Sequence, residues 1–144
     1  MSSPALIDPR GPRFGAWVTS AVLAVVLLLS GSDSAAALLL TGQAVVFALG
    51  SRGRSPYVVA WKRFLRAGPP AELEAAAPTR FAQLVGLSFA VVGAVGFLTG
   101  LTLLGQVATA FALVAALLNA AVGLCLGCEL YLLFTRSTTR GATA

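Results

Sequence analysis

Four long apolar segments dominate this chain, and they restrict its possible folds more than any other feature. They cover about residues 14–30, 35–50, 80–103 and 106–134. Segments of about this length, folded as helices, can cross the hydrocarbon core of a bilayer. Only 10% of the residues are charged, which is too few to cover the surface of a soluble domain. We therefore predict an all-α, polytopic membrane protein with a single membrane domain over residues 1–144.

The connections predict how the four spans pair. A short polar turn follows the first span, and a very short one near Gly105 follows the third. The spans therefore form two antiparallel hairpins, joined by a long connection over residues 51–79. The lead-in is polar, and Pro9 and Pro12 argue against a regular helix before residue 14. In the third span, Gly96 and Gly100 have the small-xxx-small spacing that allows close helix packing.

Two polar residues inside the spans need hydrogen-bond partners. Gln43 lies in the second span, which is the shortest, and Asn119 lies in the fourth. An amide at membrane depth is stabilised when a neighbouring helix supplies a donor or acceptor. We predict that both side chains are buried polar residues with partners on other helices.

The long connection contains an amphipathic stretch at residues 56–66. Aromatic side chains recur there at helical spacing on one face, and basic side chains lie on another. This pattern is typical of a helix lying in the headgroup plane of a membrane. The residues predicted to contact the membrane surface or a partner protein are Tyr57, Trp61, Lys62, Phe64 and Arg66.

The second half of the long connection predicts little regular structure. Gly68-Pro69-Pro70 breaks the chain, and polar turns carrying Glu72 and Glu74 are predicted to end at Pro78. Thr79 is then the predicted N-cap of the third span.

The basic residues fix the predicted orientation. All ten Lys and Arg residues fall in the lead-in, in or beside the long connection, or after the fourth span, and the other two connections contain none. Cytoplasmic connections of membrane proteins carry the excess of Lys and Arg. Both termini and the long connection are therefore predicted to be cytoplasmic. The net charge of +5 is then explained by topology and by contact with anionic lipids rather than by nucleic-acid binding.

A secretory signal peptide is an alternative interpretation of the first span. Arg10 and Arg13 would form its charged region, and small residues after the span would supply a cleavage site. The three further apolar segments favour a helix that is retained in the membrane.

Cys125-Leu126-Gly127-Cys128 is the one motif with evident chemistry, and it contains both cysteines of the chain. Such pairs can cycle between dithiol and disulfide, carry a persulfide, or donate two thiolates to a metal. No histidine is present, so a closed zinc site would need further ligands. Packing is the structural alternative, because a free cysteine behaves as a small apolar residue.

The depth of this motif suggests a cytosolic site. An uninterrupted fourth helix places the thiols near the cytoplasmic boundary, where thiols are normally kept reduced. Within such a helix the two Cβ atoms are too far apart for a disulfide. We therefore expect free thiols, with Gly127 as the position where the helix would have to loosen on oxidation.

Glu129 follows the cysteine pair directly. A carboxylate at membrane depth is often functional, and here a proton relay beside the thiols is one interpretation. The alternative is a structural one, in which Glu129 lies at the interface and pairs with Arg136, Arg52 or Arg54. The candidate catalytic residues are therefore Cys125, Cys128 and Glu129, and no cofactor or metal is expected.

Several stretches make the chain similar to a bacterial family of membrane proteins, the domain-of-unknown-function 4395 family. They are Ile7-Asp8-Pro9-Arg10 with Arg13-Phe14, then Arg54-Ser55-Pro56, and last Asn119 with Gly123-x-Cys125-x-Gly127-Cys128. The resemblance implies a location in the bacterial inner membrane. By gene neighbourhood, members resemble partners of thioredoxin-like and sulfurtransferase proteins, which implies thiol-redox or sulfur-handling work.

Two functions therefore compete at the level of sequence. The first is a membrane thiol protein that works with a cytosolic thioredoxin- or rhodanese-like partner through its CxxC motif. The second is a non-enzymatic membrane subunit or small-solute carrier, assembled as a homo-oligomer through glycine-rich helix faces. Whether the protein is an enzyme stays open on the sequence alone.

Overall fold

The computed structural model describes residues 5–70 and 72–142, and within these it is all-α apart from one pair of two-residue strands. Residues 1–4 of the expected lead-in, Ala71, and the last two residues of the chain lie outside the described residues. The elements in chain order are β1 (Leu6–Ile7), α1 (Arg10–Leu28), α2 (Asp33–Ser51), α3 (Pro56–Phe64), β2 (Glu74–Ala75), α4 (Ala76–Leu98), α5 (Thr102–Val122) and α6 (Leu126–Ala142).

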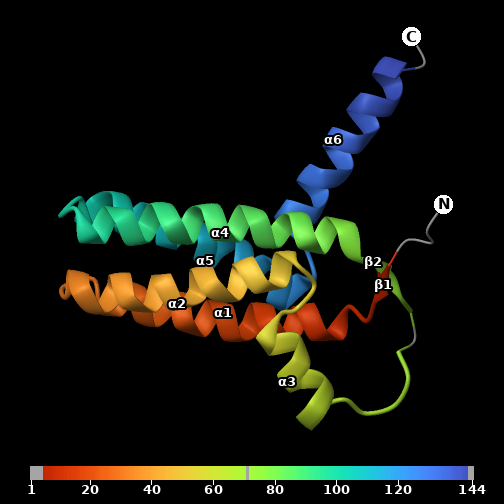
Figure 1. Cartoon of the computed structure of the whole chain (residues 1–144), viewed down its shortest axis with the longest axis horizontal. Helices are drawn as coiled ribbons and strands as arrows, with labels where there is room; N and C mark the ends of the chain where they lie inside the picture. Colours follow the sequence, from red (N-terminus) through yellow and green to blue (C-terminus); the bar gives the residue numbers. More distant parts are fainter. Residues whose placement is uncertain (1–4, 71, 143–144) are drawn as a thin grey trace.

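Four of the helices form a bundle. α1 contacts α2 and α5, and α4 contacts the same two helices from the other side, so the four close into a ring. The short α1–α2 and α4–α5 connections lie at one end, and α3, α6 and the strand pair lie at the other (Figure 1). This arrangement confirms the predicted pair of antiparallel hairpins.

Each helix of the bundle is long and apolar enough to cross a membrane. Their inner faces pack into a core of small and branched residues, formed by Leu23, Val26, Ala36, Ala37, Leu40, Ala94, Phe97 and Ala112. Their outer faces are apolar as well. Leu28, Leu38 and Leu103 are each more than 70% exposed, an arrangement that only a lipid environment makes favourable. The chain is therefore described as a multi-pass membrane protein.

Proline positions account for two differences from the predicted boundaries. α1 begins at Arg10, with Pro9 as its N-cap and Pro12 in its first turn. α4 begins at Ala76 and includes Pro78 and Thr79, so the predictions that Pro78 ends a turn and that Thr79 caps the helix are wrong. The physical reason is the same in both cases. The N–H groups of a helix's first turn have no partner within the helix, so a proline there, which lacks the N–H group, removes no hydrogen bond.

The strand pair ties the lead-in to the long connection. β1 and β2 are antiparallel, with Leu6 opposite Ala75 and Ile7 opposite Glu74. The sequence did not predict this pair, because each strand has only two residues. The residues around Glu74 are therefore extended rather than folded into the predicted polar turns.

An ion pair fastens the same region. The Arg10 guanidinium donates to both carboxylate oxygens of Asp8, at 2.9–3.3 Å, and also to the backbone carbonyls of Ala67 and Gly68. The hydrogen bond from Arg10 holds the pKa of the Asp8 carboxyl below its usual value. Arg10 therefore attaches the segment after α3 to the start of α1.

The helix approach predicted at Gly96 is present. A Cβ at this position would lie 2.7 Å from the backbone nitrogen of Gly105 on α5, so only glycine fits. Gly100 does not share this contact. It has a φ of +78° and lies in the turn between α4 and α5, a conformation that glycine adopts without strain.

Candidate functional site

The helix that was expected to carry the cysteine pair is interrupted. α5 ends at Val122, and Gly123 takes the left-handed conformation, with a φ of +74°. The N–H groups of Gly123 and Leu124 donate to the carbonyls of Asn119 and Leu118, which satisfies carbonyls at the end of the helix. The prediction of one helix over residues 106–134 is therefore wrong, because a glycine cap stops α5 and α6 starts in a new direction (Figure 1).

Cys125 and Cys128 lie where α6 begins. Cys125 is the last residue before the helix, and Cys128 is in its first turn. The two are joined by a disulfide, with Cα atoms 5.1 Å apart. The expectation that the two Cβ atoms are too far apart for a disulfide assumed a continuous helix. It is wrong because Cys125 stands outside α6, and the chain loosens at Gly123 rather than at Gly127.

Backbone hydrogen bonds fix Cys125 in the position of a helix N-cap. The N–H of Cys128 donates to the Cys125 sulfur at 3.3 Å. The N–H of Glu129 donates to the Cys125 carbonyl at 3.0 Å. The Cys125 side chain thus accepts one of the N–H groups that a helix start leaves without an internal partner.

Gly127 explains the tight packing of α6 on α4. A Cβ at Gly127 would lie 2.6 Å from the Cα of Ala82 and 2.7 Å from its Cβ. Only a residue without a side chain therefore allows the start of α6 to touch the backbone of α4. The glycine of the CxxC motif sets the distance between these two helices.

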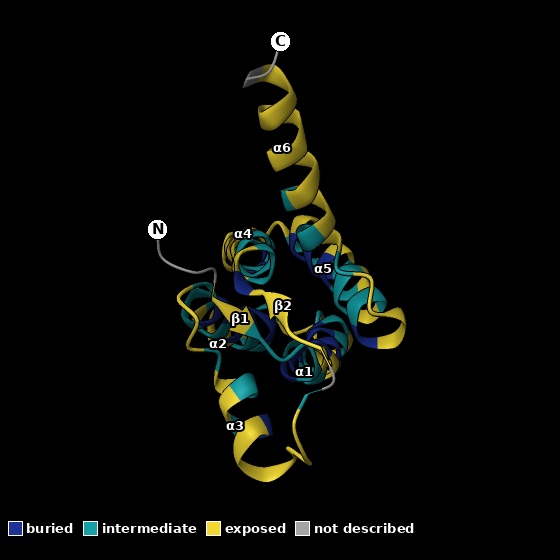
Figure 2. Cartoon of the chain, turned by 90° about the vertical axis from the view of Figure 1, so that its right-hand side faces the viewer, coloured by how far each residue is buried: buried dark blue, intermediate teal, exposed yellow. Residues whose placement is uncertain are grey.

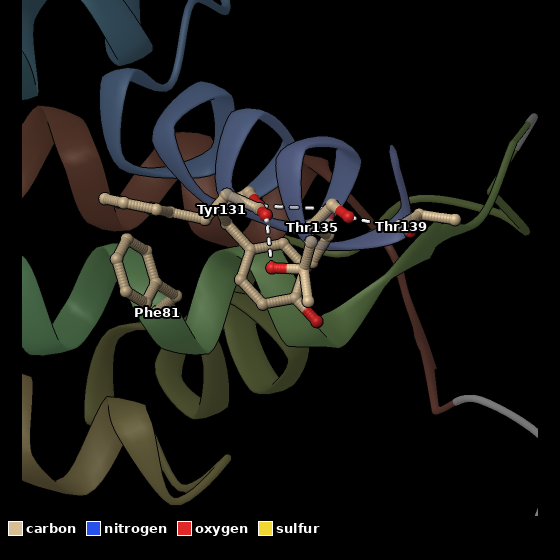
Figure 3. Close-up of a pocket in the computed structure, with 6 residues that line it drawn as sticks. Phe81, Tyr131, Thr135 and Thr139 are labelled. Carbon is tan, nitrogen blue, oxygen red and sulfur yellow. Dashed lines mark hydrogen bonds between the residues drawn. The ribbon is translucent and has the colours of Figure 1, made fainter. Parts of the chain in front are cut away.

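Aromatic residues continue the contact one and two turns further along α6. The ring centroid of Phe81 on α4 lies 5.8 Å from that of Tyr131 and 6.4 Å from that of Phe134. Figure 3 shows Phe81 and Tyr131 on the two sides of an open hollow between α4 and α6, with Thr135 and Thr139 further along. Together with Gly127, these contacts hold the cysteine pair against the start of α4.

The surroundings of the pair are partly open. Both cysteines are half-buried, and the exposed neighbours are apolar, with Val122 at 68% and Leu124 at 41%. The guanidinium of Arg13 lies 3.8 Å from where a Cβ of Gly123 would be, two residues from Cys125. The sequence did not single out Arg13 as a site residue, because only the packing of α1 on α5 brings it to this turn.

Glu129 is exposed and lies in the first turn of α6. Its carboxylate there interacts favourably with the positive end of the helix dipole. Among the described residues the ion pair is the one between Arg10 and Asp8, so the predicted pairing of Glu129 with an arginine is not present. Its role as a proton relay stays a prediction.

Gln43 is buried, as predicted, with 2% of its surface exposed. Its side-chain nitrogen donates to the Thr19 hydroxyl at 3.2 Å, and its oxygen accepts from the Tyr57 hydroxyl at 2.9 Å. Burial raises the pKa of Tyr57 above its usual value. Asn119 is only half-buried, and its described hydrogen bond is through its backbone carbonyl, to Gly123.

The predicted docking residues fall into two groups. Tyr57 and Trp61 pack toward α1, and Trp61 is only 7% exposed, with the Arg10 guanidinium 5.3 Å from its ring centroid. These two aromatic residues therefore help to attach α3 to α1, and the buried Trp61 is not part of an open surface. Lys62, Phe64 and Arg66 are exposed, and their docking role stays a prediction.

Comparison with known proteins agrees with this description at the level of family. The model of a family described as a domain of unknown function (DUF4395) matches residues 7–136. The chain belongs to this family. Comparisons with curated proteins and with solved structures give no match. The matched region contains the whole bundle and the cysteine pair, and the description of the family states no activity.

Proposed function

We propose that this membrane protein exchanges electrons or sulfane sulfur with a cytosolic thioredoxin- or sulfurtransferase-like partner through Cys125 and Cys128. The observation that carries the proposal is the placement of the pair. The two sulfurs lie within bonding distance, at the start of a helix and half-exposed, at the end of the bundle that holds α3 and the strand pair. A buried packing pair would have no need of any of these features.

The local geometry gives the two cysteines different roles. In the reduced state, the Cys125 sulfur would face the N-terminus of α6 and the N–H of Cys128. Helix N-termini and N–H donors favour the thiolate, which is the nucleophilic form. The Arg13 guanidinium lies near Gly123, two residues before Cys125, and adds a positive charge at this turn. Cys125 is therefore the proposed nucleophile, and Cys128 is the proposed resolving cysteine.

The exchange of electrons balances in two steps. A thiolate of a dithiol partner attacks the Cys125 sulfur, which breaks the Cys125–Cys128 bond and forms a mixed disulfide, and Cys128 leaves as a thiolate that takes up a proton. The second partner thiolate then attacks its own neighbour's sulfur and releases Cys125. The partner is oxidised by two electrons and the pair is reduced by two, and the same steps run in reverse.

Sulfur transfer would use the reduced pair. The Cys125 thiolate attacks the outer sulfur of a persulfide on the partner, which leaves as a thiolate. The product is a persulfide on Cys125, and no net oxidation or reduction takes place. The two reactions therefore start from different states of the pair, which separates them by experiment.

A cytoplasmic orientation supports a cytosolic partner. All ten Lys and Arg residues lie in the first two turns of α1 or α4, in the α2–α4 connection, or in α6. These segments are at the end of the bundle that carries the cysteines (Figure 1), and such a bias is typical of cytoplasmic segments. α3 and α6 project from opposite sides of this end (Figures 1 and 2). A partner that also contacts Lys62 and Arg66 would have to reach across the bundle.

Trapping of mixed disulfides tests the proposal. In native membranes, Cys128→Ser leaves the nucleophile without its resolving cysteine, so it should accumulate a mixed disulfide with a thioredoxin-like protein, and Cys125→Ser should trap much less. Equal trapping by both variants, or none, would contradict the proposal. A persulfide-specific label on Cys125 of the reduced protein would identify sulfur transfer. Thiols that stay inert to alkylation after reduction would favour the subunit or carrier alternative.

A further inference from the structure

Two arginines flank the glycine that ends α2, and a third packs against it from α4. Gly53 adopts the left-handed conformation, with a φ of +77°. The N–H groups of Gly53 and Arg54 donate to the carbonyls of Gly50 and Leu49, both at 2.9 Å, which is the hydrogen-bond pattern of a glycine cap. Arg52 and Arg54 stand on either side of Gly53, so their backbones are fixed by this cap.

Arg80 supplies the third guanidinium. Its Nη2 atom lies 3.0 Å from the position that a Cβ on Gly53 would occupy. Gln83, one turn later on α4, packs in the same way on Gly50. The close packing of α2 on α4 therefore holds Arg80 level with the turn that follows α2.

This turn lies at the depth of the lipid headgroups. With 19 residues, α2 is about 28 Å long and crosses most of a hydrocarbon core of about 30 Å. Figure 1 shows the end of α2 and the start of α4 at the same end of the bundle. The three arginines are therefore at the boundary between hydrocarbon and water.

Arg80 also begins a row of exposed residues along α4. The row recurs every three or four positions and therefore occupies one face of the helix. After Arg80 it consists of Leu84, Ser88, Val91, Val95 and Leu98, and its four apolar members are 47–69% exposed. Because α4 is one of the membrane-crossing helices, this face meets lipid, and an acyl chain that lies along it has its headgroup beside Arg80.

The positive charges at this turn lack a carboxylate partner in the part of the chain that the structure describes. All three arginines are exposed, and the ion pair within residues 5–70 and 72–142 is the one between Arg10 and Asp8. The C-terminus of α2 carries about half a negative unit charge, so most of the charge of three guanidinium groups is not balanced. Phosphate suits such a site, because guanidinium groups bind its oxygens through paired hydrogen bonds.

We propose that Arg52, Arg54 and Arg80 bind the phosphate of an anionic phospholipid headgroup, whose acyl chain lies along the exposed face of α4. Basic sites between membrane helices on the cytoplasmic side bind such headgroups. Lipid is the occupant rather than free phosphate, because the site is continuous with a lipid-facing surface. The inference does not depend on the chemistry of the cysteines.

Native mass spectrometry of the full chain in detergent tests the site. Phosphatidylglycerol should bind more tightly than phosphatidylcholine. Arg80→Gln should weaken phosphatidylglycerol binding about fivefold, since one arginine near an anionic lipid contributes about 1 kcal/mol. Arg54→Gln should weaken it to a similar extent, and it leaves the contact between Arg80 and Gly53 in place, so a folding defect of the first variant would not decide the result. Arg63→Gln, exposed on α3, removes one charge outside the site and should leave the affinity unchanged.

Three outcomes overturn the proposal. An equal loss of affinity in Arg63→Gln would show a general effect of surface charge. Equal affinities for phosphatidylglycerol and phosphatidylcholine would show that the anionic headgroup is not recognised. Thermal unfolding in lipid-free detergent distinguishes the source of the phosphate, because a ligand that binds the folded state raises the unfolding temperature. Millimolar inorganic phosphate should cause no rise, and a rise that is lost in Arg80→Gln would assign the site to free phosphate.

Discussion

Replacement of Gly127 by alanine tests the contact that fixes the cysteine pair on the bundle. The new Cβ would lie 2.6 Å from the Cα of Ala82, whereas non-bonded carbons prefer 3.5–4.0 Å. The Ala82 Cα is backbone in the second turn of α4 and cannot rotate away. α6 must therefore move outward by roughly 1 Å, which also weakens the stacking of Tyr131 on Phe81.

Two effects of opposite sign set the magnitude. Overpacking of this kind costs about 1–3 kcal/mol, whereas Gly→Ala inside a helix gains about 1 kcal/mol. The net loss is about 1 kcal/mol, or roughly fivefold in the equilibrium between docked and undocked α6. The four-helix bundle should remain folded, because α6 is not part of its ring of contacts.

Fluorine NMR provides the assay, because the chain has only two tyrosines. In protein labelled with fluorotyrosine, the Tyr131 resonance reports the ring contact with Phe81, and Tyr57 on α3 is an internal control. Gly127→Ala should shift or split the Tyr131 signal and leave the Tyr57 signal in place. Gly141→Ala is the matched control, since no atom lies within 4 Å of its added Cβ. A Tyr131 signal that is unchanged in Gly127→Ala would refute the close packing.

Three further changes have expected outcomes. Gly123→Ala forces a residue with a side chain into a φ of +74°, so the free energy of thermal unfolding should fall by about 1–2 kcal/mol. Gly42→Ala is the control, because its added Cβ meets no atom within 4 Å, and it should not show this loss. Tyr57→Phe removes one hydrogen bond to Gln43, so the free energy of thermal unfolding should fall by about 0.6 kcal/mol. A fall of more than about 2 kcal/mol would contradict the assigned hydrogen bond. Asp8→Asn should speed tryptic cleavage after Arg66, because the Arg10 contact that holds the next two residues is weakened. The hydrogen bond from Arg10 lowers the pKa of Asp8. The Asp8–Arg10 contact therefore contributes fully to stability above the usual carboxyl pKa, and this contribution is lost only as the pH falls through the lower pKa of the folded state. The cleavage rate of the wild-type protein should accordingly show no Asp8 titration between pH 6.5 and 8.5.

The bundle itself could be predicted because its causes are local. A run of apolar residues with the right length crosses a membrane whatever it packs against, and the polar turns between runs define the hairpins. The burial of Gln43 also followed from the sequence, since an amide at that depth needs a partner. Which partners it has, Thr19 and Tyr57, depends on helices that are distant in sequence.

The sequence identified the cysteine pair but did not predict its geometry. The motif identified Cys125 and Cys128, and hydropathy continued through Gly123 without a polar break, so one long helix was expected. The glycine alone was compatible with both a helix interior and a helix cap. Similarly, the spacing of Tyr57 and Trp61 was compatible with a membrane face or with packing, and contact with α1 decided for packing.

The sequence by itself thus determined that four apolar helices cross a membrane, and that the basic residues and the cysteine pair lie at one end. These properties depend on composition along the chain and on the solvent that it requires. Only the tertiary structure decided that α5 stops at Gly123, that Gly127 rests on Ala82, and that Cys125 becomes the cap of a new helix. The physical reason is that α6 packs on Phe81 and Ala82 of α4, which lie more than 40 residues before their partners Tyr131 and Gly127. A local sequence pattern cannot show a contact over that separation.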